Sequence, residues 1–287
     1  MRVAGPINLN FFCHKMPEFD GAAEAAWADV LAPFYEELGL DKAAPEVVLR
    51  RPFDTETCAL VEELKPEVVS FHFGLPEAQL MARLKRAGVT ILSSATTVAE
   101  AAWLEKNGCD AVIAQGLEAG GHRATFLEAG VVDQSPAHDL LREILSVVKI
   151  PVIAAGAIMN AENLADMLRA GAVAGQVGTA YLYCPEAKIS TLYREALKLV
   201  ETDGTVLTNV FSGRLARGIV NRFVKSAGPV NRHAPVFPFA ARLVAPLRKE
   251  SEARGSIDFM QMWAGEAAAY GTEMTAAELT VMLGAAA

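Results

Sequence analysis

The sequence predicts an α/β fold with a parallel sheet, best described as a TIM-type (β/α)8 barrel. Short apolar runs alternate with amphipathic helical segments along the first two thirds of the 287-residue chain. Strands are expected to start at residues 68, 89, 111, 151 and 176, so the repeat is regular except for one long interval after residue 111. Aromatic residues make up only 7% of a chain that is 52% hydrophobic, which suits helix-covered parallel strands better than a β-sandwich.

The individual elements are predicted in order from the N-terminus. A strand is expected over residues 6–12, then a helix over 22–38 that ends at Gly39, and a second helix capped by Asp54. Further strands are expected at 68–73, 89–92, 111–114, 151–155 and 175–177, with a helix after each of the first four. Thr97 and Glu100 have the spacing of a capping box at the start of the helix that follows strand 89–92. This alternation implies right-handed crossovers and a parallel sheet.

Six βα units are found, whereas a complete barrel has eight. A barrel of about 250 residues uses roughly 31 residues per unit, which assigns residues 1–184 to the six units. Residues 185–287 show no buried-strand pattern, and helices are expected near 190–200, 240–254 and 256–269. We therefore expect a barrel domain over 1–184 that lacks its first two βα units. A mostly helical cap or substrate domain is expected over 185–287, and its last helix could pack back on the barrel.

Composition excludes several classes of function. The net charge is −8 and the pI about 5.3, which argues against nucleic acid or an anionic membrane as the main partner. The four cysteines are far apart and form no C-x-x-C pair, which argues against a zinc site or a disulfide framework. They indicate a reducing compartment, and neither a signal peptide nor an apolar run of membrane-spanning length is found. A cytoplasmic protein without a resident metal is expected.

The long interval contains the strongest candidate for a functional site. The buried strand 111–114 is followed by Gln115 and a glycine-rich loop that ends in Gly120, Gly121, His122 and Arg123. Glycine lets backbone approach a planar ligand closely, and an imidazole in a water-poor pocket can act as a general base. His122 is therefore the candidate catalytic residue. Gln115 could bond a ring carbonyl or nitrogen, or could simply be a satisfied polar cap.

The ends of the other strands add candidate binding residues. Gly156 and Ala157 follow one strand, and Gln176, Gly178 and Thr179 lie at the end of the next. In barrels that bind phosphorylated cofactors, the loops after the last two strands often hold the phosphate by backbone N–H groups. Asn10, His72 and Ser94 would point to the same mouth, and each could equally be a structural cap.

With these residues in view, the sequence resembles the nitronate monooxygenase family, formerly called 2-nitropropane dioxygenases. The resemblance is carried by Ala-Gln-Gly-Leu-Glu-Ala-Gly-Gly-His-Arg (114–123), Pro-Val-Ile-Ala-Ala-Gly (151–156) and Gln-Val-Gly-Thr-Ala-Tyr-Leu (176–182). Further matches are Asn-Leu-Asn-Phe-Phe (8–12), Ser-Gly-Arg-Leu-Ala-Arg-Gly (212–218) and Trp-Ala-Gly (263–265). They extend over nearly the whole chain.

The resemblance implies a flavoenzyme. FMN would lie across the mouth of the barrel, with its phosphate at Gly156, Gly178 and Thr179 and its ring near Asn10, Ser94 and Gln115. His122 matches the histidine that takes the α-proton from a nitroalkane or orients a nitronate. One electron then passes to FMN, and O2 completes conversion to a carbonyl compound and nitrite. A small nitro or nitronate compound and O2 would be the partners.

Three departures from the family pattern are visible. The first strand, with its Ala-Pro-Met loop, and the second unit have no counterpart in the chain. Ala157 stands where the family usually has glycine, and Glu266 where it usually has glutamine.

Two other functions stay open: an NAD(P)H-dependent reductase of enoyl thioesters or quinones, and a non-catalytic barrel remnant. The edges of an incomplete barrel could also be closed by self-association, which would give a homo-oligomer.

Overall fold

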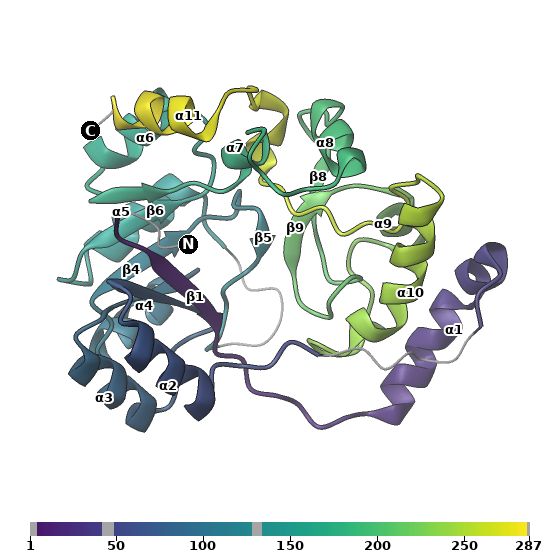
Figure 1. Ribbon diagram of the computed structural model, residues 1–287, viewed down its shortest axis with the longest axis horizontal. Helices are drawn as coiled ribbons and strands as arrows, with labels where there is room; N and C mark the ends of the chain where they lie inside the picture. The colour runs from purple at the N-terminus through teal and green to yellow at the C-terminus, as the bar shows by residue number, and fades with distance from the viewer. Residues whose placement is uncertain (1–4, 42–48, 128–133, 286–287) are drawn as a thin grey trace.

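The computed structural model describes residues 5–41, 49–127 and 134–285 (Figure 1). Its main feature is a six-stranded parallel sheet in which the strands lie in chain order. The strands are β1 (Asn8–Phe12), β2 (Val68–His72), β3 (Thr90–Ala95), β4 (Ala111–Gln115), β6 (Val152–Ala155) and β7 (Ala174–Gln176). The parallel α/β fold that the sequence predicts is confirmed.

Helices cover one face of this sheet. They are α2 (Thr55–Leu64), α3 (Ala78–Ala87), α4 (Val98–Lys106), α5 (Ala137–Leu145) and α6 (Ala161–Arg169). Alternate residues of β2 illustrate the packing: Val69 and Phe71 are fully buried against Cys58 and Val61 of α2. The residues between them, such as Ser70, face the other side of the sheet, where the strands leave room for a site.

Of the two hydrogen bonds that the predicted capping box at α4 requires, only one is formed. Thr97 does accept the N–H of Glu100, at 3.2 Å. The Glu100 carboxylate does not return to the Thr97 N–H. It accepts the N–H of Thr96 at 2.7 Å and that of Phe126 at 2.6 Å. The loop after His122 lies nearby, and the N–H of its Phe126 takes up the carboxylate oxygen Oε1.

A second, three-stranded antiparallel sheet lies beside the first (Figure 1). It consists of β5 (Gly121–His122), β9 (Ala216–Ile219) and β8 (Thr205–Thr208), in that order. The expectation that residues 185–287 contain no strand is therefore wrong. These strands are two to four residues long and contain glycine, arginine or threonine, so no apolar run marks them.

The helix expected over 256–269 is also absent from the described structure of that segment. Its backbone is irregular up to the 3-10 turn η1 (Glu266–Tyr270), and the following helix is α11 (Ala276–Gly284). The reason is that its backbone bonds to other parts of the chain. Met262 O accepts the N–H of Ile219 at 2.8 Å, and Glu266 N donates to Glu118 O at 2.9 Å.

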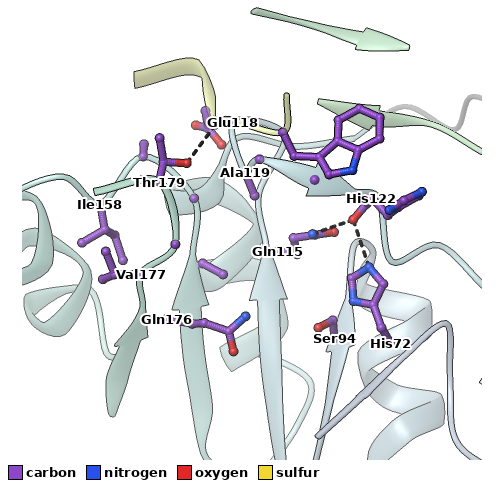
Figure 2. A pocket seen from close by; sticks show the side chains of 18 of the residues that line it. His72, Ser94, Gln115, Glu118, Ala119, His122, Ile158, Gln176, Val177 and Thr179 are labelled. Atoms are coloured by element: carbon purple, nitrogen blue, oxygen red, sulfur yellow. Dashed lines mark hydrogen bonds between the residues drawn. The ribbon is translucent and has the colours of Figure 1, made fainter. Parts of the chain in front are cut away.

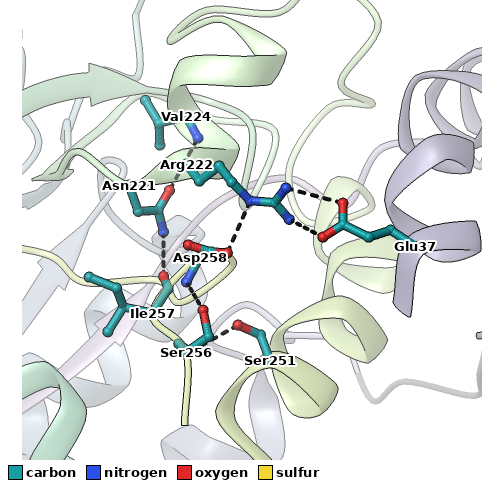
Figure 3. Close-up of polar contacts among 8 residues, drawn as sticks. All are labelled: Glu37, Asn221, Arg222, Val224, Ser251, Ser256, Ile257 and Asp258. Atoms are coloured by element: carbon teal, nitrogen blue, oxygen red, sulfur yellow. Dashed lines mark hydrogen bonds and ion pairs between the residues drawn. The ribbon is translucent and has the colours of Figure 1, made fainter. Parts of the chain in front are cut away.

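The other helices are α1 (Gly21–Leu38), α7 (Thr179–Leu182), α8 (Thr191–Lys198), α9 (Arg222–Ala227) and α10 (Ala240–Ala253). Helix α1 packs against α10, and Trp27 and Tyr35 donate hydrogen bonds to backbone carbonyls of α10. Figure 3 shows how Arg222 pairs with Glu37 of α1 at 2.8 Å and with Asp258 at 3.0 Å. Thus α1, which lies in the predicted barrel region 1–184, packs against elements of the predicted cap region 185–287. The division of the chain at residue 184 stays a prediction.

Helix α11 packs against α6, which belongs to the parallel sheet. Among the described helices, none combines the length and the hydrophobicity that crossing a membrane requires.

Candidate active site

A cavity of about 620 Å³ opens at the carboxyl ends of the parallel strands. Its size is within the usual range for small-molecule and cofactor sites. The candidate site residues that the sequence singled out line it: Asn10, His72, Ser94, Gln115, Gly121, His122, Gly156, Ala157, Gln176, Gly178 and Thr179. Figure 2 labels His72, Ser94, Gln115, His122, Gln176 and Thr179 among them. They come from the six parallel strands or the loops after them and from β5, so the fold brings them together.

The register of the sheet explains this convergence. Gln115 at the end of β4 lies beside Ala155 of β6, and Ala155 lies beside Gln176 of β7. Toward the opposite edge of the sheet, Asn10 lies beside Ser70, whose hydroxyl accepts a hydrogen bond from the Asn10 amide at 2.8 Å. Because neighbouring parallel strands end together, their last residues form one polar floor.

His122 is held by its backbone from both sheets. His122 pairs with Ala216 of β9, and this pairing makes it part of the second sheet. Its carbonyl oxygen accepts hydrogen bonds from His72 Nε2 and Gln115 Nε2, both at 2.9 Å, from the first sheet (Figure 2). The position of the histidine is therefore fixed by elements on both sides of the cavity.

These contacts refine the interpretation of two polar residues. Gln115 uses its amide oxygen as well, accepting the N–H of Ala124 at 2.9 Å. Its principal contacts thus anchor the loop after β4, as a satisfied polar cap would. His72 both lines the cavity and supports the loop. Its Nε2 must carry the proton, because a carbonyl oxygen only accepts.

The His122 ring lies against aromatic side chains. The ring centroids of Trp263, Phe237 and Phe12 are 5.3, 5.5 and 6.0 Å from it. Burial above all, together with the nearby His72, Arg214 and Arg50, lowers the pKa of His122 to about 3. The imidazole is therefore neutral at neutral pH and able to accept a proton.

Arg123 is a residue whose role the sequence did not reveal. It is fully buried, and its guanidinium donates to Gln115 O at 2.8 Å and Gly116 O at 2.6 Å. Burial lowers its pKa to about 10, so it stays charged at neutral pH. It binds the free carbonyls at the end of β4 and fixes the turn into the loop. Arginine is rarely fully buried, so only the position of Arg123 directly after His122 could have suggested its structural role.

The loops after β6 and β7 present free backbone donors to the cavity. The N–H groups of Ala157, Gly178 and Thr179 bond to no acceptor in residues 5–41, 49–127 and 134–285. A Cβ added at Gly178 would meet no atom within 4 Å, so the backbone there is open. Such a group of N–H donors suits an anion such as a phosphate.

Ala157 adopts a φ of +56°, in the left-handed region that favours glycine. The chain therefore accommodates the alanine at this family glycine position with local backbone strain. Glu266, the third departure, does not add an uncompensated charge to the cavity. It does not line the cavity, although Gly265 and Ala267 do, and its carboxylate lies 3.6 Å from Arg217 Nη2.

In the part of the chain that the structure describes, no group of three or more His, Cys, Asp or Glu side chains could hold a metal ion. The side chains that line the cavity thus supply the imidazoles of His122 and His72, amide and hydroxyl groups and the Glu118 carboxylate, and the backbone supplies N–H donors.

Comparison with known proteins gives consistent matches over this architecture. The family model described as nitronate monooxygenase matches residues 2–284. A nitronate monooxygenase of Paraburkholderia phytofirmans is 40% identical over 281 residues, which cover 97% of this chain and 77% of that protein. One of Pseudomonas aeruginosa is 40% identical over 280 residues, which cover 96% of this chain and 79% of that protein.

Two solved structures extend the comparison. The nitroalkane oxidase from Streptomyces ansochromogenes aligns with a TM-score of 0.88 and 36% identity, over 98% of this chain and 80% of that one. FabK from Thermotoga maritima aligns with a TM-score of 0.66 and 23% identity, over 84% of this chain and 74% of that one, and shows a shared fold.

Proposed function

Because the chain belongs to the nitronate monooxygenase family, we propose that it is an FMN-dependent enzyme that oxidises alkyl nitronates with O2 to carbonyl compounds and nitrite. Neutral nitroalkanes are the second proposed substrate class. The observation that carries this proposal is the cavity itself, which combines a neutral histidine with open backbone donors for an anion. A small nitro or nitronate compound and O2 are the proposed partners.

The residues present fit FMN. The free N–H groups at Ala157, Gly178 and Thr179, with Gly156 beside them, would hold the phosphate. The polar floor of Asn10, Ser94, Gln115 and Gln176 would face the ring system, and Gly121 would let the loop backbone lie close to it. When bound, FMN would supply the redox chemistry between the nitronate and O2.

His122 is the proposed base for neutral nitroalkanes. A nitro group acidifies the α-carbon, and the imidazole, unprotonated at neutral pH, offers a lone pair to accept that proton. The aromatic rings of Trp263 and Phe12 beside the imidazole would exclude water from the reacting carbon. With a substrate that is already a nitronate, no proton has to be removed, and the imidazole would only orient the anion.

We also propose that the six parallel strands correspond to the last six strands of an eight-stranded barrel. Their chain order and the open edges at β1 and β7 support this correspondence, because two further βα units would be needed to close the sheet. The division into a barrel region, 1–184, and a cap region, 185–287, is part of the same proposal. We further propose that the chain self-associates at these open edges. A cytoplasmic location is also proposed, and the four free cysteines support it.

The first experiment is the visible spectrum of the purified 287-residue chain, before and after incubation with FMN. A bound flavin spectrum is expected. A colourless protein that cannot be reconstituted would favour the non-catalytic alternative. Anaerobic mixing then separates the two catalytic functions. Bleaching of the flavin by NADH or NADPH but not by an alkyl nitronate would overturn the oxygenase proposal.

The second experiment replaces the proposed base. His122→Ala is expected to abolish turnover of neutral nitroalkanes while sparing at least part of the turnover of preformed nitronates. His138→Ala, in an exposed histidine at the start of α5, is the matched control. Equal rates of His122→Ala and the parent on nitroalkanes would refute the role of His122.

A further inference from the structure

Ser212 contacts the His122 ring from a distant part of the chain. It lies in the connection between β8 and β9, its side chain is buried, and its Oγ is 2.9 Å from His122 Nε2. The residue next to it, Gly213, has a φ of +85°, and a Cβ there would lie 1.9 Å from Pro235 O. The turn that carries Ser212 is therefore tightly constrained.

The hydroxyl of Ser212 has three neighbours and only one proton. It can donate to Arg214 O at 3.2 Å, and it accepts the N–H of Arg214 at 3.4 Å. If His122 Nε2 carries a proton, the hydroxyl accepts from it and all three contacts are satisfied. If the hydroxyl instead donates to Nε2, its bond to the Arg214 carbonyl is lost. The first arrangement uses the whole donor and acceptor capacity of the serine.

The other ring nitrogen of His122 is Nδ1. Nδ1 bonds to no group of the residues that the structure describes, and it is not among their buried unpaired side-chain atoms. It therefore keeps accessible surface on a residue that lines the cavity. A lone pair at this atom is in the right place to meet a ligand.

We propose that Ser212 is a positioning residue that holds His122 as the Nε2–H tautomer, so that Nδ1 is the atom that accepts the substrate proton. The inference rests on the proposed function. In the step, the α-C–H bond of a neutral nitroalkane breaks, its electron pair moves into the nitro group to form the nitronate, and the proton goes to Nδ1. The bond from Nε2 to Ser212 persists unchanged in the imidazolium, so neither the ring nor the serine has to rotate.

The tautomer can be measured without any turnover. The chain has five histidines, so protein labelled with [15N]histidine can be studied by long-range 1H–15N correlation spectroscopy, with His122→Ala to assign the signal. We expect a protonated Nε2 and an unprotonated Nδ1 at His122, and a loss of this single tautomer in Ser212→Ala. A protonated Nδ1 in the parent protein would overturn the proposal.

Kinetics provide the second test. Ser212→Ala is expected to lower kcat/KM for a neutral nitroalkane about 10- to 100-fold, as the loss of one hydrogen bond to a charged group predicts. Turnover of the preformed nitronate should change little, which also shows that the variant is folded. Ser212→Thr, which keeps a hydroxyl, should retain most of the nitroalkane activity.

Ser251→Ala is the matched control. Ser251 is a buried serine of α10 whose hydroxyl donates to Ser256 O at 2.9 Å, away from the cavity (Figure 3). Both activities of this variant should match the parent. An equal loss on both substrates in Ser212→Ala would show a structural role only and contradict the proposal. If the parent turns over neither substrate, the proposed function fails, and the NMR measurement still decides the tautomer.

Discussion

Glu100 offers the sharpest test of how the histidine loop is held. Its carboxylate is 2% exposed and accepts three short hydrogen bonds, from Thr96 N at 2.7 Å, Thr96 Oγ1 at 2.8 Å and Phe126 N at 2.6 Å. No basic side chain within 4 Å pairs with it in the described residues. The carboxylate thus connects the end of β3 with the segment that follows His122.

Glu100→Ala should destabilise the fold by about 3 to 7 kcal/mol. The backbone N–H groups of Thr96 and Phe126 lose their acceptor at about 1–3 kcal/mol each, and the loss of one buried methylene adds about 0.8 kcal/mol. The Thr96 hydroxyl can rotate to another partner and adds little. Glu100→Gln keeps one acceptor oxygen but turns an NH2 group toward a donor, so a smaller loss of about 1–3 kcal/mol is expected.

Equilibrium unfolding in urea measures these differences. Trp103 is a local reporter, because its ring lies 5.2 Å from that of Phe126, and circular dichroism follows the whole chain. Lys106→Ala, at an exposed position of the same helix, should stay within about 0.5 kcal/mol of the parent. A Glu100→Ala protein within about 1 kcal/mol of the parent would show that the loop is held by other contacts.

Two further predictions concern the cavity. Because the pKa of His122 is lowered to about 3, the imidazole is unprotonated above that pH, and proton abstraction is lost only as the pH falls through this lowered value. We therefore expect kcat/KM for a nitroalkane, measured from pH 5 to 7, to show no histidine inflection. An inflection near pH 6.5 would contradict the burial of the ring. Ala157→Gly should stabilise the protein by about 0.5–1 kcal/mol, because the relief of a left-handed alanine exceeds the added entropy of glycine in the unfolded chain. An unchanged or lower urea midpoint would show that the strain at Ala157 is compensated locally.

Much of the parallel sheet could be predicted, because strands such as β4 and β6 are short apolar runs, although β1 and β7 contain Asn, Gly or Gln. Residues 111–114 are such a run, and the strand ends that follow from this pattern point to one cavity. The short strands β5, β8 and β9 could not be found in this way. Gly121 and His122 form a strand only because β9, nearly a hundred residues later, pairs with them.

The polar contacts inside the site were the least predictable part. The partner of His122 is Ser212, and nothing in the local sequence of either residue indicates that they meet. Glu100 matched a local capping motif, yet its carboxylate bonds to Phe126, which lies 26 residues later. Local motifs predict which groups need partners, whereas the tertiary fold decides which partners they find.

The double attachment of His122 has a consequence for the folding of the whole chain. Its backbone joins the two sheets, which also share a hydrophobic cluster that contains Val112 of β4, Val152 of β6 and Ile219 of β9. A molecule bound between the floor of the parallel sheet and the imidazole would contact both sheets at once. Its binding energy would add to the contacts that already couple them, so occupancy of the cavity should raise the unfolding temperature of both sheets together.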